Sequence, residues 1–227
     1  MSLQQFSLFH ETSGDRLKSW HTPYAEVFQD SGPVLDVGCG PGYFADVLRD
    51  LGIESLGVDI DPEMVKMATQ RGHKVILGNQ ESFTERAGQF GGVHVSHVVE
   101  HLWGDELETL LKNALTALRP GGILIVRTPN WENRFVRERL FWMDHTHKRP
   151  YPGELLIRMM KDLGMVEVQT GFEPTGMNDT FVIAAKPPFT KTGLKVHFPT
   201  ADSHSGNVLQ HGKQLARKKL KAFLEIA

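Results

Sequence analysis

From residue 33 onward, the chain alternates short apolar runs with segments that carry apolar residues on one helical face. Short runs rich in Val, Ile and Leu are typical of buried strands. The segments between them have helical spacing and several end at glycine, which is typical of amphipathic helices. The pattern predicts strands at residues 33–38, 54–60, 73–78, 92–99, 123–129, 165–172 and 179–186, and helices at 43–52, 61–72, 104–122 and 151–164.

The order of these elements predicts an α/β fold in three parts. Strands that alternate with helices form a mostly parallel sheet covered on both faces, and the last two strands come close enough in sequence to form an antiparallel pair. Residues 31–186 would form this core. Residues 187–227 predict an irregular extension ending in an amphipathic basic helix, whose basic face we interpret as solvated, with a partner contact as the alternative. Residues 1–30 predict a helical cap because they are rich in aromatic side chains, namely Phe6, Phe9, Trp20, Tyr24 and Phe28.

The composition limits which cellular compartments and which binding partners are expected. The 227 residues carry a formal net charge of −2, which predicts no general attraction to nucleic acid or to an acidic membrane. The single Cys39 excludes an internal disulfide and fits a reducing compartment. No signal peptide and no apolar stretch of membrane-spanning length is evident in the sequence. We therefore expect a cytoplasmic protein without membrane insertion, and a homodimer is left open.

The first predicted strand runs into a glycine-rich loop, LDVGCGPGYF. Gly38, Gly40 and Gly42 let the backbone turn sharply and bring bare N–H groups against a ligand. A dinucleotide site needs its third glycine where this chain has Tyr43, so a pyrophosphate ligand is disfavoured.

Two carboxylates define the expected ligand further. Asp36 lies inside the strand just before the loop, where it would repel a diphosphate but can face a ligand ammonium. Asp59 ends the second strand, where an acidic side chain can bridge both ribose hydroxyls. A ligand with an ammonium group, a ribose and no phosphate describes S-adenosylmethionine.

At this point the chain resembles the class I S-adenosylmethionine-dependent methyltransferases. The resemblance covers roughly residues 30–186 and rests on VLDVGCGPGYF, LGVDIDPEMV, VVEHL and LRPGGILIVRTPN, in the family's order. It implies a Rossmann-like sheet of seven strands in the order 3-2-1-4-5-7-6, with strand 7 antiparallel. It also implies roles in cofactor binding: the methionine moiety for Asp36, Gly38 and Gly40, the ribose for Asp59, and the adenine for Ile60, Asn79 and Gln80.

The stretch HVSHVVEHL, residues 94–102, is expected to end the fourth strand and to turn toward the acceptor pocket. His97 is predicted to line the cofactor and acceptor pockets. His97, His101 and His147, the last from a polar loop at 141–151, are candidates for the base that removes a proton from a hydroxyl acceptor. By strand alternation, His94 points to the opposite face from His97 and is interpreted as a packing residue.

A metal site is the alternative interpretation of this stretch. In the quinone-biosynthesis and small-RNA relatives that the chain resembles, an E-x-x-E-H element binds a divalent metal. The corresponding residues would be His97, Glu100 and His101, joined by His147, and three imidazoles would favour zinc over magnesium. We favour the metal-free interpretation, in which Glu100 and His101 shape the turn.

The leading hypothesis is O-methylation of a small molecule or saccharide. A small-RNA 2′-O-methyltransferase is the second, and the charge of −2 and the lack of an aromatic–basic array argue against it. A non-catalytic S-adenosylmethionine-binding protein is the third. Five basic residues flank the acceptor side, namely Arg134, Arg137, Arg139, Lys148 and Arg149. We interpret the first three as a solvated helix face, and the alternative is a basic rim that attracts an anionic acceptor such as a sugar nucleotide or phosphorylated glycan.

Overall fold

The computed structural model describes residues 14–174, 178–191 and 193–198. The predicted C-terminal basic helix lies outside these residues, as do Phe6 and Phe9 of the predicted cap. None of the helices in the described part of the chain has both the length and the apolar character that a membrane-spanning helix needs.

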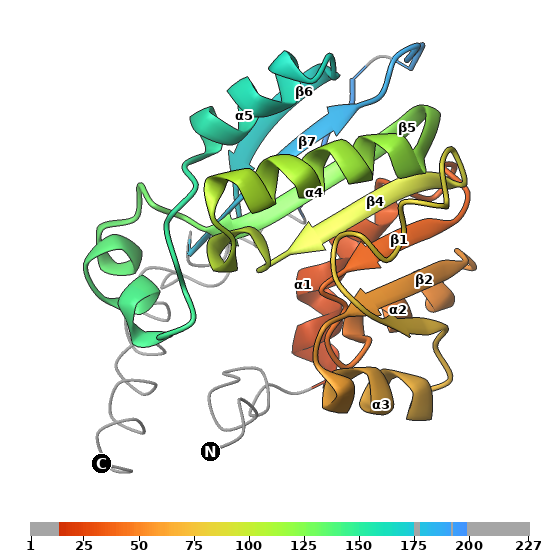
Figure 1. Ribbon diagram of the computed structural model, residues 1–227, viewed down its shortest axis with the longest axis horizontal. Coiled ribbons are helices and arrows are strands. Elements are labelled where there is room, and N and C mark those ends of the chain that lie inside the picture. The colour runs from red at the N-terminus through yellow and green to blue at the C-terminus, as the bar shows by residue number, and fades with distance from the viewer. Residues whose placement is uncertain (1–13, 175–177, 192, 199–227) are drawn as a thin grey trace, which may run out of the picture.

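A seven-stranded sheet forms the centre of the molecule (Figure 1). Its strands run in the order β3-β2-β1-β4-β5-β7-β6, and only β7 lies antiparallel to its neighbours. The predicted strand order and the predicted antiparallel end are therefore confirmed. The strands are β1 (Val34–Val37), β2 (Ser55–Asp59), β3 (Val75–Leu77), β4 (Phe90–Ser96), β5 (Leu118–Pro129), β6 (Val166–Phe172) and β7 (Asp179–Ala185).

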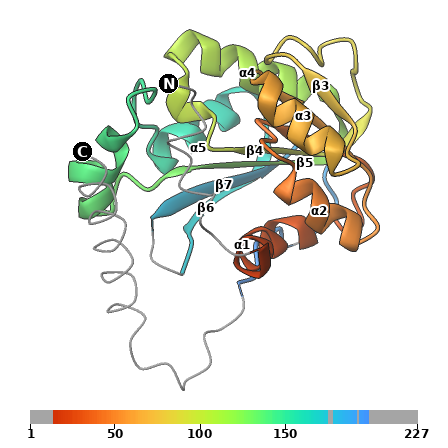
Figure 2. The same ribbon diagram turned by 90° about the horizontal axis from the view of Figure 1, so that it is seen from below.

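Helices cover both faces of the sheet (Figure 2). One face packs against α1 (Gly14–Glu26) and α2 (Tyr43–Asp50), and the other packs against α4 (Gly104–Ala117) and α5 (Gly153–Asp162). The helix α3 (Pro62–Gln70) lies beside β2 and β3, with Asp61 as its N-cap, as the sequence predicted. Since alternate residues of each strand face opposite layers, the strands contribute to two separate apolar clusters.

The helix predicted at residues 104–122 ends earlier, at Ala117. Lys186 explains the difference, because its Nζ donates hydrogen bonds to the carbonyls of Leu115 and Leu118 and so satisfies the exposed end of the helix. Gly121 then takes a φ of 76° and donates its N–H to the Lys186 carbonyl, so the Pro-Gly-Gly sequence belongs to β5.

Two segments outside the regular core shape the molecule further. Val136–Leu140 and Phe141–Met143 form short helical turns, η3 and η4, that the sequence pattern did not predict. The described part of the irregular extension packs on the core, because Leu194 is buried and the Phe198 ring lies 5.7 Å from the ring of Tyr24 in α1. This segment therefore helps to bury α1 against the sheet.

Candidate active site

The glycine loop follows β1 with Gly38, Gly40 and Gly42 at φ values of 73°, 51° and 86°. A Cβ added at Gly38 would lie 2.3 Å from Cγ2 of Val98, and one at Gly42 would lie 2.6 Å from Cδ2 of His73. Among the described residues, apart from its two neighbours in the chain, none has an atom within 4 Å of a Cβ added at Gly40. Two glycines are therefore required by close packing inside the protein, whereas Gly40 faces open space that a ligand can fill.

Asp59 joins the end of β2 to this loop. Its carboxylate accepts hydrogen bonds from the N–H of Gly40 at 2.8 Å and from the N–H of Asp61 at 2.9 Å. Burial raises the pKa of Asp59, against the lowering effect of these two N–H groups. Two of the roughly four lone-pair positions of the carboxylate remain for the hydroxyls of a ribose.

An open hollow of about 380 Å³ lies next to Asp59 in sequence. Ile60 is 74% exposed there and Leu77 56%, so two large apolar side chains offer a surface for a planar ring. The hollow is lined by Ile60, Pro62, Leu77, Gly78, Asn79 and Ser82. Exposed apolar surface beside a carboxylate and a bare backbone loop fits an adenosine, so these residues are compatible with S-adenosylmethionine.

In the structure, the side-chain oxygen of Asn79 and the backbone of Gln80 bond to the protein itself. The Asn79 Oδ1 accepts the N–H of Glu81 at 2.9 Å and so stabilises its own turn, although Asn79 still lines the hollow. Gln80 does not line it, and its backbone carbonyl accepts from Asn113 Nδ2 of α4. Both residues position the wall of the hollow.

Asp36 does not face solvent. It is 2% exposed, and its Oδ1 lies 2.7 Å from Nδ1 of His94 on the neighbouring strand. His94 is 1% exposed and stacks on the Phe44 ring, with centroids 3.8 Å apart. The packing predicted for His94 is present, but the hydrogen bond to Asp36 was missed by the sequence reasoning.

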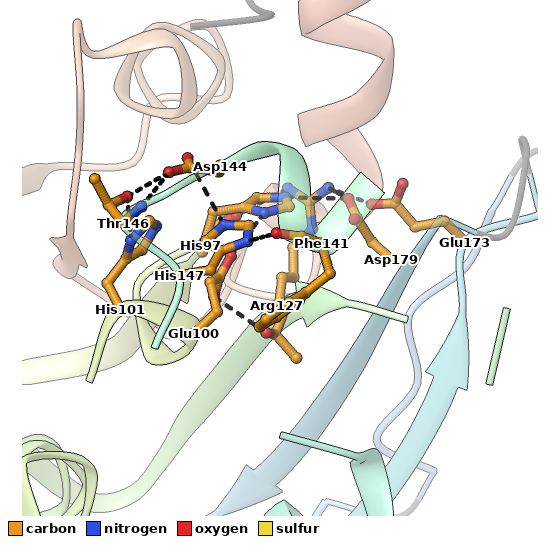
Figure 3. A network of polar contacts seen from close by, with 12 residues as sticks. His97, Glu100, His101, Arg127, Phe141, Asp144, Thr146, His147, Glu173 and Asp179 are labelled. Carbon is orange, nitrogen blue, oxygen red and sulfur yellow. Dashed lines mark hydrogen bonds and ion pairs between the residues drawn. The ribbon is translucent and has the colours of Figure 1, made fainter. Parts of the chain in front are cut away.

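His97 departs from the strand pattern on which its prediction rested. The strand β4 ends at Ser96, and His97 takes a φ of 54°, a left-handed conformation that is uncommon for a residue other than glycine. Its Nδ1 lies 3.1 Å from Oε1 of Glu100 and its Nε2 lies 3.1 Å from Oδ2 of Asp179 (Figure 3). Burial alone would lower the pKa of His97, but these carboxylates outweigh it and raise the pKa to about 10.

A ring that donates from both nitrogens has no lone pair with which to take a proton from an acceptor. The geometry therefore favours a positioning role for His97 over the predicted role of a base. Asp179 also contacts Arg127, a buried cation that binds Glu173 as well, so His97 ties the turn after β4 to a larger network of charges.

The contacts of His97 with Glu100 and Asp179 predict how the stability of the fold depends on pH. Because the pKa of His97 is raised above the unfolded value, its contribution is complete below about pH 6.5 and is lost as pH rises toward 10, by at most about 1.4 kcal/mol per pH unit. The free energy of unfolding in urea should therefore differ most between the native chain and His97→Gln at pH 6, and the difference should shrink by pH 9. If the free energies of unfolding of the two proteins changed in parallel with pH, His97 would not be held by these two carboxylates.

His101 is held by a short relay. Thr146 Oγ1 lies 2.6 Å from Oδ1 of Asp144 and 2.9 Å from Nδ1 of His101. Since a carboxylate only accepts, the Thr146 hydroxyl donates to Asp144 and accepts the Nδ1–H of His101. Burial lowers the pKa of His101, so the ring is neutral near pH 7 and its Nε2 carries a lone pair.

His147 comes from the loop predicted to reach this place. Its Nδ1 donates to the Phe141 carbonyl at 2.7 Å, and its ring centroid lies 4.8 Å from that of His101. One ligand atom from each of Glu100, His101 and His147 lies within 4.8 Å of the others, a spacing that a metal ion could bridge. The predicted set of four is not assembled, because His97 turns its ring nitrogens to Glu100 and Asp179.

An aromatic rim borders these histidines. The Phe141 ring lies 4.6 Å from that of His147, 5.4 Å from that of Trp131 and 5.1 Å from that of Trp142, which is 61% exposed. Lys148 Nζ lies 5.8 Å from the Trp103 ring centroid. Arg134, Arg137, Arg139 and Arg149 are exposed in the same stretch of the chain. Aromatic and basic side chains therefore share this stretch, with a contact between the two kinds where Lys148 meets Trp103.

Comparison with known proteins shows which family the chain resembles. A family model described as "Methyltransferase domain" matches residues 9–170. The ubiquinone biosynthesis O-methyltransferase of Xanthomonas axonopodis pv. citri is 32% identical over 106 residues, 43% of this chain and 43% of that protein. The mitochondrial ubiquinone biosynthesis O-methyltransferase of Homo sapiens is 35% identical over 107 residues, 43% of this chain and 28% of that protein. The matches thus span less than half the length of these curated relatives.

A solved S-adenosylmethionine-dependent methyltransferase from Archaeoglobus fulgidus superposes with a TM-score of 0.71 at 25% identity, over 77% of this chain and 95% of that one. The chain belongs to the methyltransferase-domain family and, within it, to the class I enzymes that depend on S-adenosylmethionine.

Proposed function

We propose that this protein transfers the methyl group of S-adenosylmethionine to a hydroxyl oxygen of a small molecule or saccharide. The observation that carries the proposal is the relay Asp144–Thr146–His101, which leaves a lone pair on Nε2 of His101, in a ring whose centroid lies 4.8 Å from that of His147. A hydroxyl nucleophile gains most from such a base, since its proton must leave as the new bond forms. The two curated relatives named above, which are called O-methyltransferases, support oxygen as the methylated atom.

When bound, S-adenosylmethionine supplies a methyl group on a sulfonium centre. The residues of this chain would align and desolvate the acceptor. His101 would accept the hydroxyl proton at Nε2, and Thr146 and Asp144 would hold its ring. The exposed Trp142, whose ring packs on the buried Phe141, would carry the body of the acceptor.

A small-RNA acceptor is a second candidate, favoured by one observation. The rings of Trp103 and Trp142 are exposed, and Lys148 Nζ lies 5.8 Å from the Trp103 ring centroid. Stacking on aromatic side chains beside positive charge is how proteins bind single-stranded nucleic acid. Under this alternative, binding would weaken steeply with added salt.

The deciding experiment is a transfer assay with methyl-labelled S-adenosylmethionine and three acceptor sets: hydroxylated aromatic compounds, sugar nucleotides with phosphorylated glycans, and short RNA oligonucleotides. Each set is run with and without a chelator. We expect label on a hydroxyl oxygen in one of the first two sets. Label confined to RNA would favour the second candidate, and label on nitrogen or sulfur would overturn O-methylation. Loss of transfer with the chelator, restored by a divalent ion, would assign Glu100, His101 and His147 to a metal.

A further inference from the structure

A buried carboxylate joins the turn that carries His101 to the rest of the site. The turn is η2 (Val99–His101), and its middle residue, Glu100, is 0% exposed. The Oε2 atom of Glu100 accepts a hydrogen bond from Oγ1 of Thr128 in β5 at 3.0 Å, and its backbone carbonyl accepts one from the N–H of Lys148 at 2.8 Å. Since Lys148 belongs to the loop that carries the rest of the relay, Glu100 holds both parts of the relay in one place.

The other carboxylate oxygen of Glu100 depends on His97. It lies 3.1 Å from Nδ1 of the His97 ring, and the backbone of His97 is in the left-handed region at a φ of 54°. Such a conformation is strained for a residue other than glycine and persists only where the surroundings hold it. The N–H of His97 donates to the Arg127 carbonyl at 3.0 Å, and Nε2 of its ring lies 3.1 Å from Oδ2 of Asp179. Asp179 is therefore the outer support of a strained residue.

This support comes from a distant part of the chain. Asp179 is the first residue of β7 and stands 82 residues from His97 in the sequence. Two carboxylates share the buried guanidinium of Arg127, those of Asp179 and Glu173 (Figure 3). Glu173 also accepts from the hydroxyl of Tyr24 in α1, whereas Asp179 also contacts the ring of His97. The chain therefore offers two carboxylates with the same cation and different second partners.

We propose that Asp179 is a positioning residue for methyl transfer: by holding the ring of His97, it fixes the turn η2 and the orientation of His101. The inference rests on the proposed function, because it takes His101 as the group that receives the proton of the acceptor. Asp179 contacts neither the cofactor nor the acceptor in this scheme. A displacement of about 1 Å at the reacting groups can lower a rate about 10²-fold, so a carboxylate outside the site can set turnover without setting affinity.

The test compares Asp179→Ala with Glu173→Ala as its matched control. Each variant removes one of the two carboxylates that bind Arg127, so each should lose stability to a similar degree, measured by unfolding in urea. Only Asp179→Ala also removes the support of the His97 ring. The values of kcat and KM are measured with whichever acceptor takes label in the transfer screen, whatever atom is methylated, and cofactor affinity is measured by calorimetry.

We expect kcat to fall about 10- to 100-fold in Asp179→Ala and to stay within about threefold in Glu173→Ala, with cofactor affinity within about threefold in both. Asp179→Asn should keep more turnover than Asp179→Ala, because its amide oxygen can still accept from Nε2 of His97. An equal fall of kcat in the two alanine variants, or no fall in Asp179→Ala, would overturn the proposal. If Asp179→Ala does not fold, Asp179→Asn is compared with Glu173→Gln, and a fall of less than about threefold in Asp179→Asn would overturn it.

A double-mutant cycle with His97→Gln shows whether Asp179 acts through His97. Groups that act through one contact have effects that do not add. The variant that carries both Asp179→Ala and His97→Gln should therefore turn over about as slowly as His97→Gln alone, because the support is already lost. If the two losses of kcat multiply, Asp179 acts by another route and the proposal is wrong.

Amide hydrogen exchange tests the support of the turn without any acceptor. The N–H groups of His101 and Lys148 each donate to a backbone carbonyl of residues 98–100. Both should exchange at least about tenfold faster in Asp179→Ala than in Glu173→Ala, because only the first change loosens η2. Equal exchange in the two variants would overturn the proposal. Faster exchange in Asp179→Ala together with undiminished turnover in His101→Gln would separate the two ideas: the hold of Asp179 on η2 would stand, and the proposed role of His101 would fall.

Discussion

Replacing His101 by glutamine is expected to lower kcat by about 10²- to 10⁴-fold, the usual contribution of a general base. The affinity for S-adenosylmethionine should stay within about a few-fold, because the proposed function assigns His101 to the acceptor and not to the cofactor. The fall in kcat is expected because glutamine lacks the lone pair of Nε2, which is free in His101 since Thr146 accepts the Nδ1–H. The measurement is turnover with the acceptor found in the labelling screen, paired with calorimetric binding of the cofactor.

Thr146→Val is the matched control for this relay. Valine has nearly the shape of threonine but cannot hold Nδ1 of His101, so kcat should fall less than in His101→Gln. Because burial lowers the pKa of His101, the native enzyme should keep its activity as pH falls below about 6.5 and lose it only as this lowered pKa is crossed. Equal loss of kcat and of cofactor affinity in His101→Gln would instead indicate a structural role.

The fold could be predicted from the sequence because its signals are local. Strand and helix periodicities, the glycine loop and Asp59 at a strand end each occupy a few consecutive residues. The helix boundary at Ala117 was missed because it depends on Lys186, whose Nζ reaches the carbonyls of Leu115 and Leu118 from far along the chain.

The site was less predictable because its partners meet only in three dimensions. The bond between Asp36 and His94 follows from strand register, and the relay joins His101 to Thr146, which lies 45 residues away. Strand alternation failed at His97 because a left-handed φ follows the last residue of β4. One signal was present, since Arg127 interrupts an apolar strand run and a buried charge requires a partner.

Replacing Asp59 by alanine is expected to weaken S-adenosylmethionine binding by about 100-fold, because hydrogen bonds to a charged group contribute roughly 1.5–3 kcal/mol each. The change removes the proposed ribose contact and also the acceptor that holds the Gly40 N–H at 2.8 Å. Calorimetric titration with the cofactor measures the effect.

Asp61→Ala is the matched control for Asp59→Ala, because both carboxylates accept backbone N–H groups and stand two residues apart. Asp61 accepts from the Glu63 N–H and caps α3, so its loss should cost about 0.5–2 kcal/mol of stability and leave cofactor affinity nearly unchanged. Similar affinities in the two variants would show that Asp59 acts only as a turn residue. A loss of affinity in Asp59→Ala alone would assign the carboxylate at the end of β2 to the cofactor. Both variants lose a carboxylate that accepts a backbone N–H, but only the Asp59 carboxylate contacts the glycine loop.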